Sequence, residues 1–69
     1  MSYELRKIMR ALFRKGVVIV REGGGHTIIR SQNGRQTSVP RHKSVRRSTT
    51  RKIVKELGLK WEEVERDML

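Results

Sequence analysis

The sequence predicts a small α+β domain in the order α-β-β-β-α, with a three-stranded antiparallel sheet, helices on one sheet face and a short C-terminal helix. Three observations predict this fold class. Apolar residues recur with helical spacing near both ends of the chain, and short β-branched runs lie between them. Turn-forming glycines separate these runs closely enough for hairpins. Because the chain has 69 residues, we expect one domain, residues 1–69, with a small core.

The first helix is expected from about Tyr3 to Lys15. Its apolar residues recur at i, i+3, i+4, i+7 and i+8, which places them on one helix face. The members of this stripe are Leu5, Ile8, Met9, Leu12 and Phe13. Ser2 is the expected N-cap, and Gly16 is expected to end the helix in the left-handed conformation.

Three short strands are expected to follow, over residues 17–21, 26–31 and 35–39. Gly23 to Gly25 should turn the chain between the first two. Asn33-Gly34 predicts a type I′ hairpin turn between the second and third, because both residues tolerate positive φ. Pro40 has no amide hydrogen for the strand ladder and should end the third strand.

Residues 41–47 form a basic connector to a second helix. Ser48 or Thr49 is the expected cap, and Gly58 is expected to end this helix. Its apolar face comprises Ile53, Val54 and Leu57, with Thr50 beside it. The final segment, Trp61 to Met68, has the apolar spacing of a short helix that needs tertiary docking.

The charge of the chain points to an anionic partner. Seventeen basic and seven acidic residues give a formal net charge of +10. No acid occurs between Gly23 and Lys55, so a polyanion site explains the run better than a solvated face does. The absence of cysteine excludes disulfides, cysteine zinc sites and thiol nucleophiles.

No membrane or secretory segment is evident. The longest apolar run, Val17 to Val20, is far too short to cross a bilayer, and the N-terminus lacks a signal-peptide core. A cytoplasmic location is therefore expected.

His26 is the candidate catalytic residue. It directly follows the glycine turn, and histidine exchanges a proton near neutral pH. Gly24 and Gly25 carry no side chain, so an RNA backbone can come close to them. The alternative is a hydrogen-bonded histidine at a strand start, which we would prefer without the glycines and the charge.

Cations near His26 are candidates for phosphate contacts, because guanidinium matches phosphate geometry. Arg30 follows His26 by four residues and should lie on the same strand face. The other candidates for RNA binding are Arg41, His42, Lys43 and Arg47. No third ligand of good type accompanies the two histidines, so neither a metal nor a small-molecule cofactor is expected. Trp61 and Phe13 are interpreted as core or docking residues.

In order and spacing, these elements resemble the HicA family, also called YcfA-like, over residues 5–59. The resemblance rests on the strand from Gly16, on Gly24-Gly25-His26 and its strand, on Asn33-Gly34-Arg35, on Val39-Pro40-Arg41-His42-Lys43, and on the segment 49–59. It implies a fold like the double-stranded-RNA-binding domain and an mRNA interferase toxin. It also implies that His26 is catalytic and that a HicB-type antitoxin is the partner. Gly25 stands where serine is usual in the family, and Lys60 replaces a small cap residue.

The charge, the candidate site and the resemblance leave two functions open. The first is a metal-independent endoribonuclease of a toxin–antitoxin pair that acts on mRNA. The alternative is a non-catalytic RNA-binding module on the same fold, which the charge and element order support equally well. A DNA-binding role lacks support, since no helix-turn-helix pattern is present.

Overall fold

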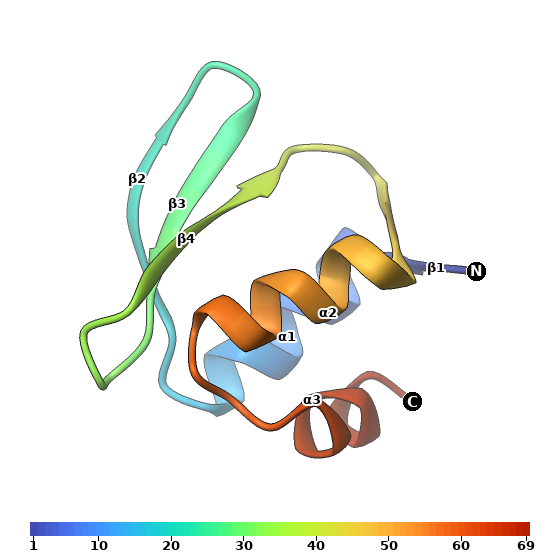
Figure 1. Ribbon diagram of the computed structural model, residues 1–69. Coiled ribbons are helices and arrows are strands. Elements are labelled where there is room, and N and C mark those ends of the chain that lie inside the picture. Colours follow the sequence, from blue (N-terminus) through green and yellow to red (C-terminus); the bar gives the residue numbers. More distant parts are fainter.

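A computed structural model describes all 69 residues and confirms the α+β class (Figure 1). In chain order the elements are β1 (Ser2–Glu4), α1 (Leu5–Arg14), β2 (Val18–Gly23), β3 (His26–Arg30), β4 (Gln36–Pro40), β5 (Ser44–Arg46), α2 (Arg47–Glu56) and α3 (Trp61–Met68). Strands β2, β3 and β4 form the predicted antiparallel meander. The helices gather beside this meander, and its first hairpin projects away from them (Figure 1). None of the helices is long and apolar enough to cross a bilayer.

A second, two-stranded sheet was not predicted. Strand β1 pairs antiparallel with β5, with Tyr3 opposite Val45 and both side chains buried. The expected start of the first helix at Tyr3 is therefore wrong, and Ser2 lies in a strand instead of acting as its N-cap. The basic connector contains β5 for the same reason. Burying Tyr3 and Val45 against the helices outweighs the local helical pattern.

The predicted cap of the second helix is also wrong. Helix α2 begins at Arg47, and its N-cap residue is Arg46, which makes no side-chain cap bond. The Thr50 hydroxyl instead donates to the Arg46 carbonyl at 2.8 Å. Strand β5 runs directly into α2, so Arg46 takes the extended cap conformation and Ser48 and Thr49 already lie inside the helix.

The helix ends follow the sequence more closely. Gly16 and Gly58 adopt φ values of 82° and 74°, and they follow α1 and α2 as expected. Helix α3 has the predicted bounds, and its N-cap residue Lys60 provides no side-chain cap bond.

Every helix and every strand except β2 contributes residues to one hydrophobic core. Helices α1 and α2 supply buried apolar residues, β3 and β4 supply Ile29 and Val39, and α3 closes the core with Val64 and Met68. Phe13 does not join it: the ring is 49% exposed, which corrects the prediction. Trp61 is partly buried and packs against the core as expected.

An ion pair supports the contact between α1 and α3. The Lys15 ammonium donates to Glu63 Oε1 at 2.8 Å, and this bond lowers the pKa of the Glu63 carboxyl from its ordinary value. The C-terminal helix therefore packs on α1 with a polar bond as well as apolar contacts.

The sheet has one covered face and one open face. In β3, Thr27 and Ile29 are buried, whereas His26 and Arg30 are exposed. Strand β2 is an edge strand, and its register shifts at Val20. Its two valines and its isoleucine, at positions 18 to 20, are all exposed.

The two hairpin turns differ in type. Gly24 has a φ of 54° and Gly25 lies outside the left-handed region, as in a type II′ turn. The predicted type I′ turn at Asn33-Gly34 is wrong, because only Gly34 has positive φ and the connection spans residues 31–35. Asn33 instead directs its side chain to the end of α2, where Nδ2 donates to the Leu57 carbonyl at 3.1 Å.

Candidate nucleic-acid interface

His26 occupies an open position at the start of β3. Its cross-strand neighbours are Gly23 on β2 and Pro40 on β4, and neither carries a long side chain. The imidazole is exposed and forms no hydrogen bond to another side chain. The Arg41 amide donates to the Gly25 carbonyl at 2.9 Å, which joins the glycine turn to the segment after β4. The backbone thus holds the turn while the histidine side chain stays free.

A groove extends from His26 across the edge of β4 to α2. It has a volume of about 490 Å³. Besides His26, its polar lining comprises Thr37 and Ser38 from β4 and Thr49, Lys52 and Glu56 from α2. The Thr37 hydroxyl donates to Glu56 Oε1 at 2.5 Å, which engages the only carboxylate in the lining. Lys52 forms no ion pair, so its ammonium leaves this part of the groove positive.

Lys52 and Thr49 were not among the residues predicted for the site. Phosphate binding was expected from the connector before α2, whereas the structure brings the helix itself to His26. The sequence contains a helical spacing that could have predicted this placement. Residues 49, 52 and 56 follow one another by three and four positions, so they share a helix face beside the buried Ile53.

Arg30 lies on the outer sheet face with His26, as predicted, but outside this groove. Four residues of strand separate the two Cα atoms by about 13 Å. The Arg30 guanidinium donates to Gln36 Oε1 from Nε at 2.9 Å and from Nη2 at 2.7 Å. Since Gln36 is neutral, this contact orients the guanidinium without cancelling its charge.

Arg41 and Lys43 lie beside α1. Arg41 lines a hollow on the covered side of the sheet together with Phe13 and Ile19. Lys43 lies near Glu4, and its carbonyl accepts a bond from the Leu5 amide at 2.9 Å. His42 is an exposed loop residue between them. The structure therefore does not bring these three side chains into the His26 groove.

Arg47 is engaged at the junction of β1, α2 and α3. Its guanidinium carbon lies 5.5 Å from the centre of the Trp61 ring, and Nη2 lies 3.5 Å from Glu65 Oε2. The Tyr3 hydroxyl, followed by Glu65, raises the pKa of Arg47 above its ordinary value. These contacts make Arg47 a packing residue of this junction, remote from the glycine turn.

Comparison with protein families gives a match that covers most of the chain. The model of the family described as the HicA toxin of bacterial toxin–antitoxin pairs matches residues 5–59, from the start of α1 to the residue after Gly58. Comparison with curated proteins finds no match. The matched part contains the meander, the glycine turn, His26 and all of α2, whereas α3 follows it.

Proposed function

The chain belongs to the HicA toxin family of bacterial toxin–antitoxin pairs, and on that premise we propose that it is a metal-independent endoribonuclease that cleaves mRNA with His26. The observation that carries this proposal is the exposed imidazole in a groove that also holds the Lys52 ammonium. A proton-transfer group and a fixed cation thus lie within one hollow on a strongly basic chain.

The reaction uses the 2′-hydroxyl of the RNA as nucleophile. His26 accepts the proton of this hydroxyl, and the 2′-oxygen bonds to the adjacent phosphorus. The bond from phosphorus to the 5′-oxygen breaks, and water supplies the proton to that leaving oxygen. The products carry a 2′,3′-cyclic phosphate and a 5′-hydroxyl.

Lys52 is the cation placed to stabilise the negative charge that develops on the phosphoryl oxygens. The glycine turn lets the RNA backbone approach His26, since an added Cβ at Gly24 or Gly25 would have no neighbour within 4 Å. In this proposal Arg30 contacts the RNA backbone farther along the outer sheet face. Recognition through the phosphate backbone supplies affinity with weak sequence preference.

The family implies a cognate antitoxin, and we propose that it is a HicB-type protein that covers the His26 groove. The net charge of +10 favours an acidic partner, because complementary charge speeds association and orients the two proteins. Such a partner blocks RNA by occupying the same cationic surface.

The decisive experiment compares His26→Ala with the wild-type protein on RNA in the presence of a chelator. We expect cleavage to fall by roughly 10²–10⁴-fold, the usual contribution of a positioned acid or base. The melting temperature should not change, because the side chain is exposed and unbonded. His42→Ala is the matched control, since it removes the other exposed histidine and should leave cleavage in place.

Two results would decide against this mechanism. Cleavage by His26→Ala at the wild-type rate would remove His26 from the reaction. Cleavage of an RNA that carries 2′-deoxyribose at the scissile position would show that the 2′-hydroxyl is not the nucleophile.

A non-catalytic RNA-binding module is the second candidate. Gly25 favours it, because the family usually has serine beside the histidine: if that hydroxyl positions the substrate, this chain lacks the contact. Intact RNA after long incubation with pure wild-type protein, together with tight RNA binding, would select this function.

A further inference from the structure

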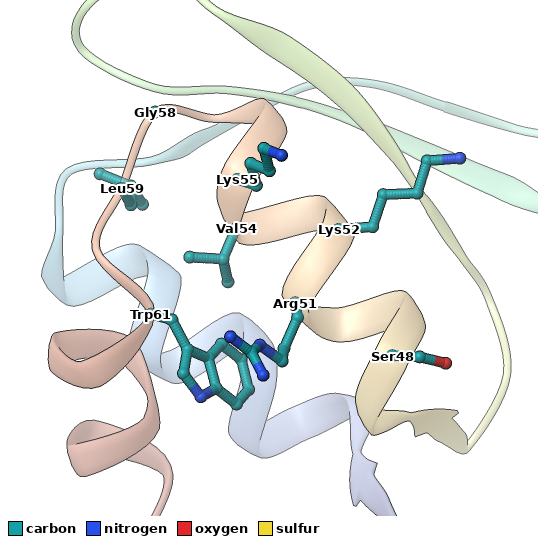
Figure 2. Close-up of a pocket in the computed structure, with 8 residues that line it drawn as sticks. All are labelled: Ser48, Arg51, Lys52, Val54, Lys55, Gly58, Leu59 and Trp61. Atoms are coloured by element: carbon teal, nitrogen blue, oxygen red, sulfur yellow. The ribbon is translucent and has the colours of Figure 1, made fainter.

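Helix α2 borders a second groove, on the side next to α3. Figure 2 shows it between α2 and the segment from Gly58 to Trp61, and its volume is about 680 Å³. The polar side chains in its lining are Ser48, Arg51, Lys52 and Lys55, and the Trp61 ring borders them. No acidic residue lines this groove, in contrast to the groove at His26, which contains Glu56.

The three cations of this groove have no ionic partner. None of Arg51, Lys52 and Lys55 takes part in any of the ion pairs of the molecule, which involve other basic residues. From Arg51 to Lys55 the helix rises by about 6 Å, so the three cations lie close together on this side of α2. A group of unpaired cations in a hollow attracts a partner with repeated negative charges.

Trp61 holds one of these cations in place. The guanidinium carbon of Arg51 lies 5.5 Å from the centre of the indole ring, and the two side chains lie beside each other in Figure 2. Stacking restricts the guanidinium but leaves its N–H groups free to donate, which favours binding of an anion. Trp61 also contacts Arg47 and Tyr3, so its ring is not a free platform for a base. This geometry suits phosphate contacts.

Lys52 connects the two grooves, because its side chain lines both of them. We propose that the groove of Arg51, Lys55 and Trp61 is a second RNA-backbone site, which holds the strand beyond the scissile bond and guides it past Lys52 to His26. The inference rests on the proposed function and adds that an RNA longer than the cleaved dinucleotide gains affinity from this second site. The cations of this groove lie within the part of the chain that matches the family model, whereas Trp61, which holds Arg51, lies outside it.

The test first measures binding without cleavage. Trp61 is the only tryptophan, so its emission reports directly on this groove. We expect a long 2′-O-methyl single strand, which lacks the nucleophile, to change this emission on binding. Arg51→Gln/Lys55→Gln should weaken the affinity about tenfold and reduce the slope of log affinity against log salt by about 1.4, the effect of two lost phosphate contacts on a single strand.

Lys7→Gln/Arg10→Gln is the matched control. These two cations lie on α1, form no ion pair and line neither groove. The control should leave affinity and salt slope unchanged. Equal weakening by both double variants, or none by Arg51→Gln/Lys55→Gln, would overturn the proposal; in the second case the groove is free for an acidic protein partner.

Cleavage then separates this inference from the proposed function. For a long RNA, Arg51→Gln/Lys55→Gln should raise KM about tenfold with kcat unchanged, whereas its rate on a dinucleotide should equal the wild-type rate. Equal losses on both substrates would overturn the second site. If the wild-type protein cleaves neither substrate, the nuclease proposal fails, and the Trp61 titration still decides whether the groove binds RNA.

Discussion

The two turns of the meander differ in how they are held: the turn beside the candidate site is open, and the other turn is bonded to a helix. The turn at Gly24 and Gly25 is open, and a single bond from the Arg41 amide ties it to the rest of the molecule. The turn between β3 and β4 is bound to the end of α2: the hydroxyl of the buried Ser31 donates to the Leu57 carbonyl at 2.9 Å, and Asn33 donates to the same oxygen.

The difference follows from what each turn faces. The Leu57 carbonyl is one of the last acceptors of α2 and needs donors, which the turn between β3 and β4 supplies. The glycine turn projects away from the helices (Figure 1), so nothing competes with a ligand for the space around His26. One end of the sheet therefore stabilises the fold, and the other keeps a reactive side chain accessible.

Glycine substitutions at the two ends should give the largest contrast in stability. Gly58→Ala forces a left-handed conformation on alanine, and its Cβ would lie 2.8 Å from the Asn33 amide nitrogen that bonds to Leu57. We expect a loss of about 2–3 kcal/mol, from backbone strain together with the weakened hydrogen bond. Gly24→Ala has strain alone, since its Cβ meets no atom within 4 Å, and should cost about 1–2 kcal/mol.

Urea denaturation of both alanine variants measures this difference. Equal losses in the free energy of unfolding would mean that the bond from Asn33 to Leu57 does not contribute to stability.

Ser31→Ala tests the bound turn directly. It removes one of the two donors to the Leu57 carbonyl, while Asn33 retains the other. We expect a loss of about 1 kcal/mol, measured by urea denaturation, because the acceptor remains partly satisfied. RNA cleavage per folded molecule should stay at the wild-type level, since Ser31 lies at the end of β3 away from His26. A drop in cleavage without a drop in stability would contradict this separation.

Gly25→Ser should have the smallest effect and the opposite sign. Gly25 lies outside the left-handed region, and an added Cβ would meet no atom within 4 Å. Replacing glycine at such a position should stabilise the fold by about 0.4–1 kcal/mol by restricting the unfolded chain. Thermal melting checks the stability, and an RNA assay should show cleavage no slower than wild type. Destabilisation would show that this position requires glycine.

Much of the fold could be predicted because its signals lie within a few residues of one another. The apolar spacing of α1, α2 and α3 and the glycines at positions 16 and 58 predicted three helices and two of their ends. The paired strands on either side of the glycine turn followed from composition in the same way. The candidate site was predicted only in part: His26 and Arg30 share a face, whereas the side chains of Arg41, Lys43 and Arg47 line other hollows.

The sequence by itself determined the helical periodicity, the order of the three meander strands, the positive charge and the position of a histidine beside a glycine turn. Each of these depends on neighbours in the chain. Tertiary structure alone decided that residues 2–4 pair with residues 44–46, that Asn33 bonds to the end of α2 instead of forming a type I′ turn, and that Lys52 shares a groove with His26. Those outcomes depend on which distant groups need burial or a hydrogen-bond partner, and packing of the whole chain settles that competition.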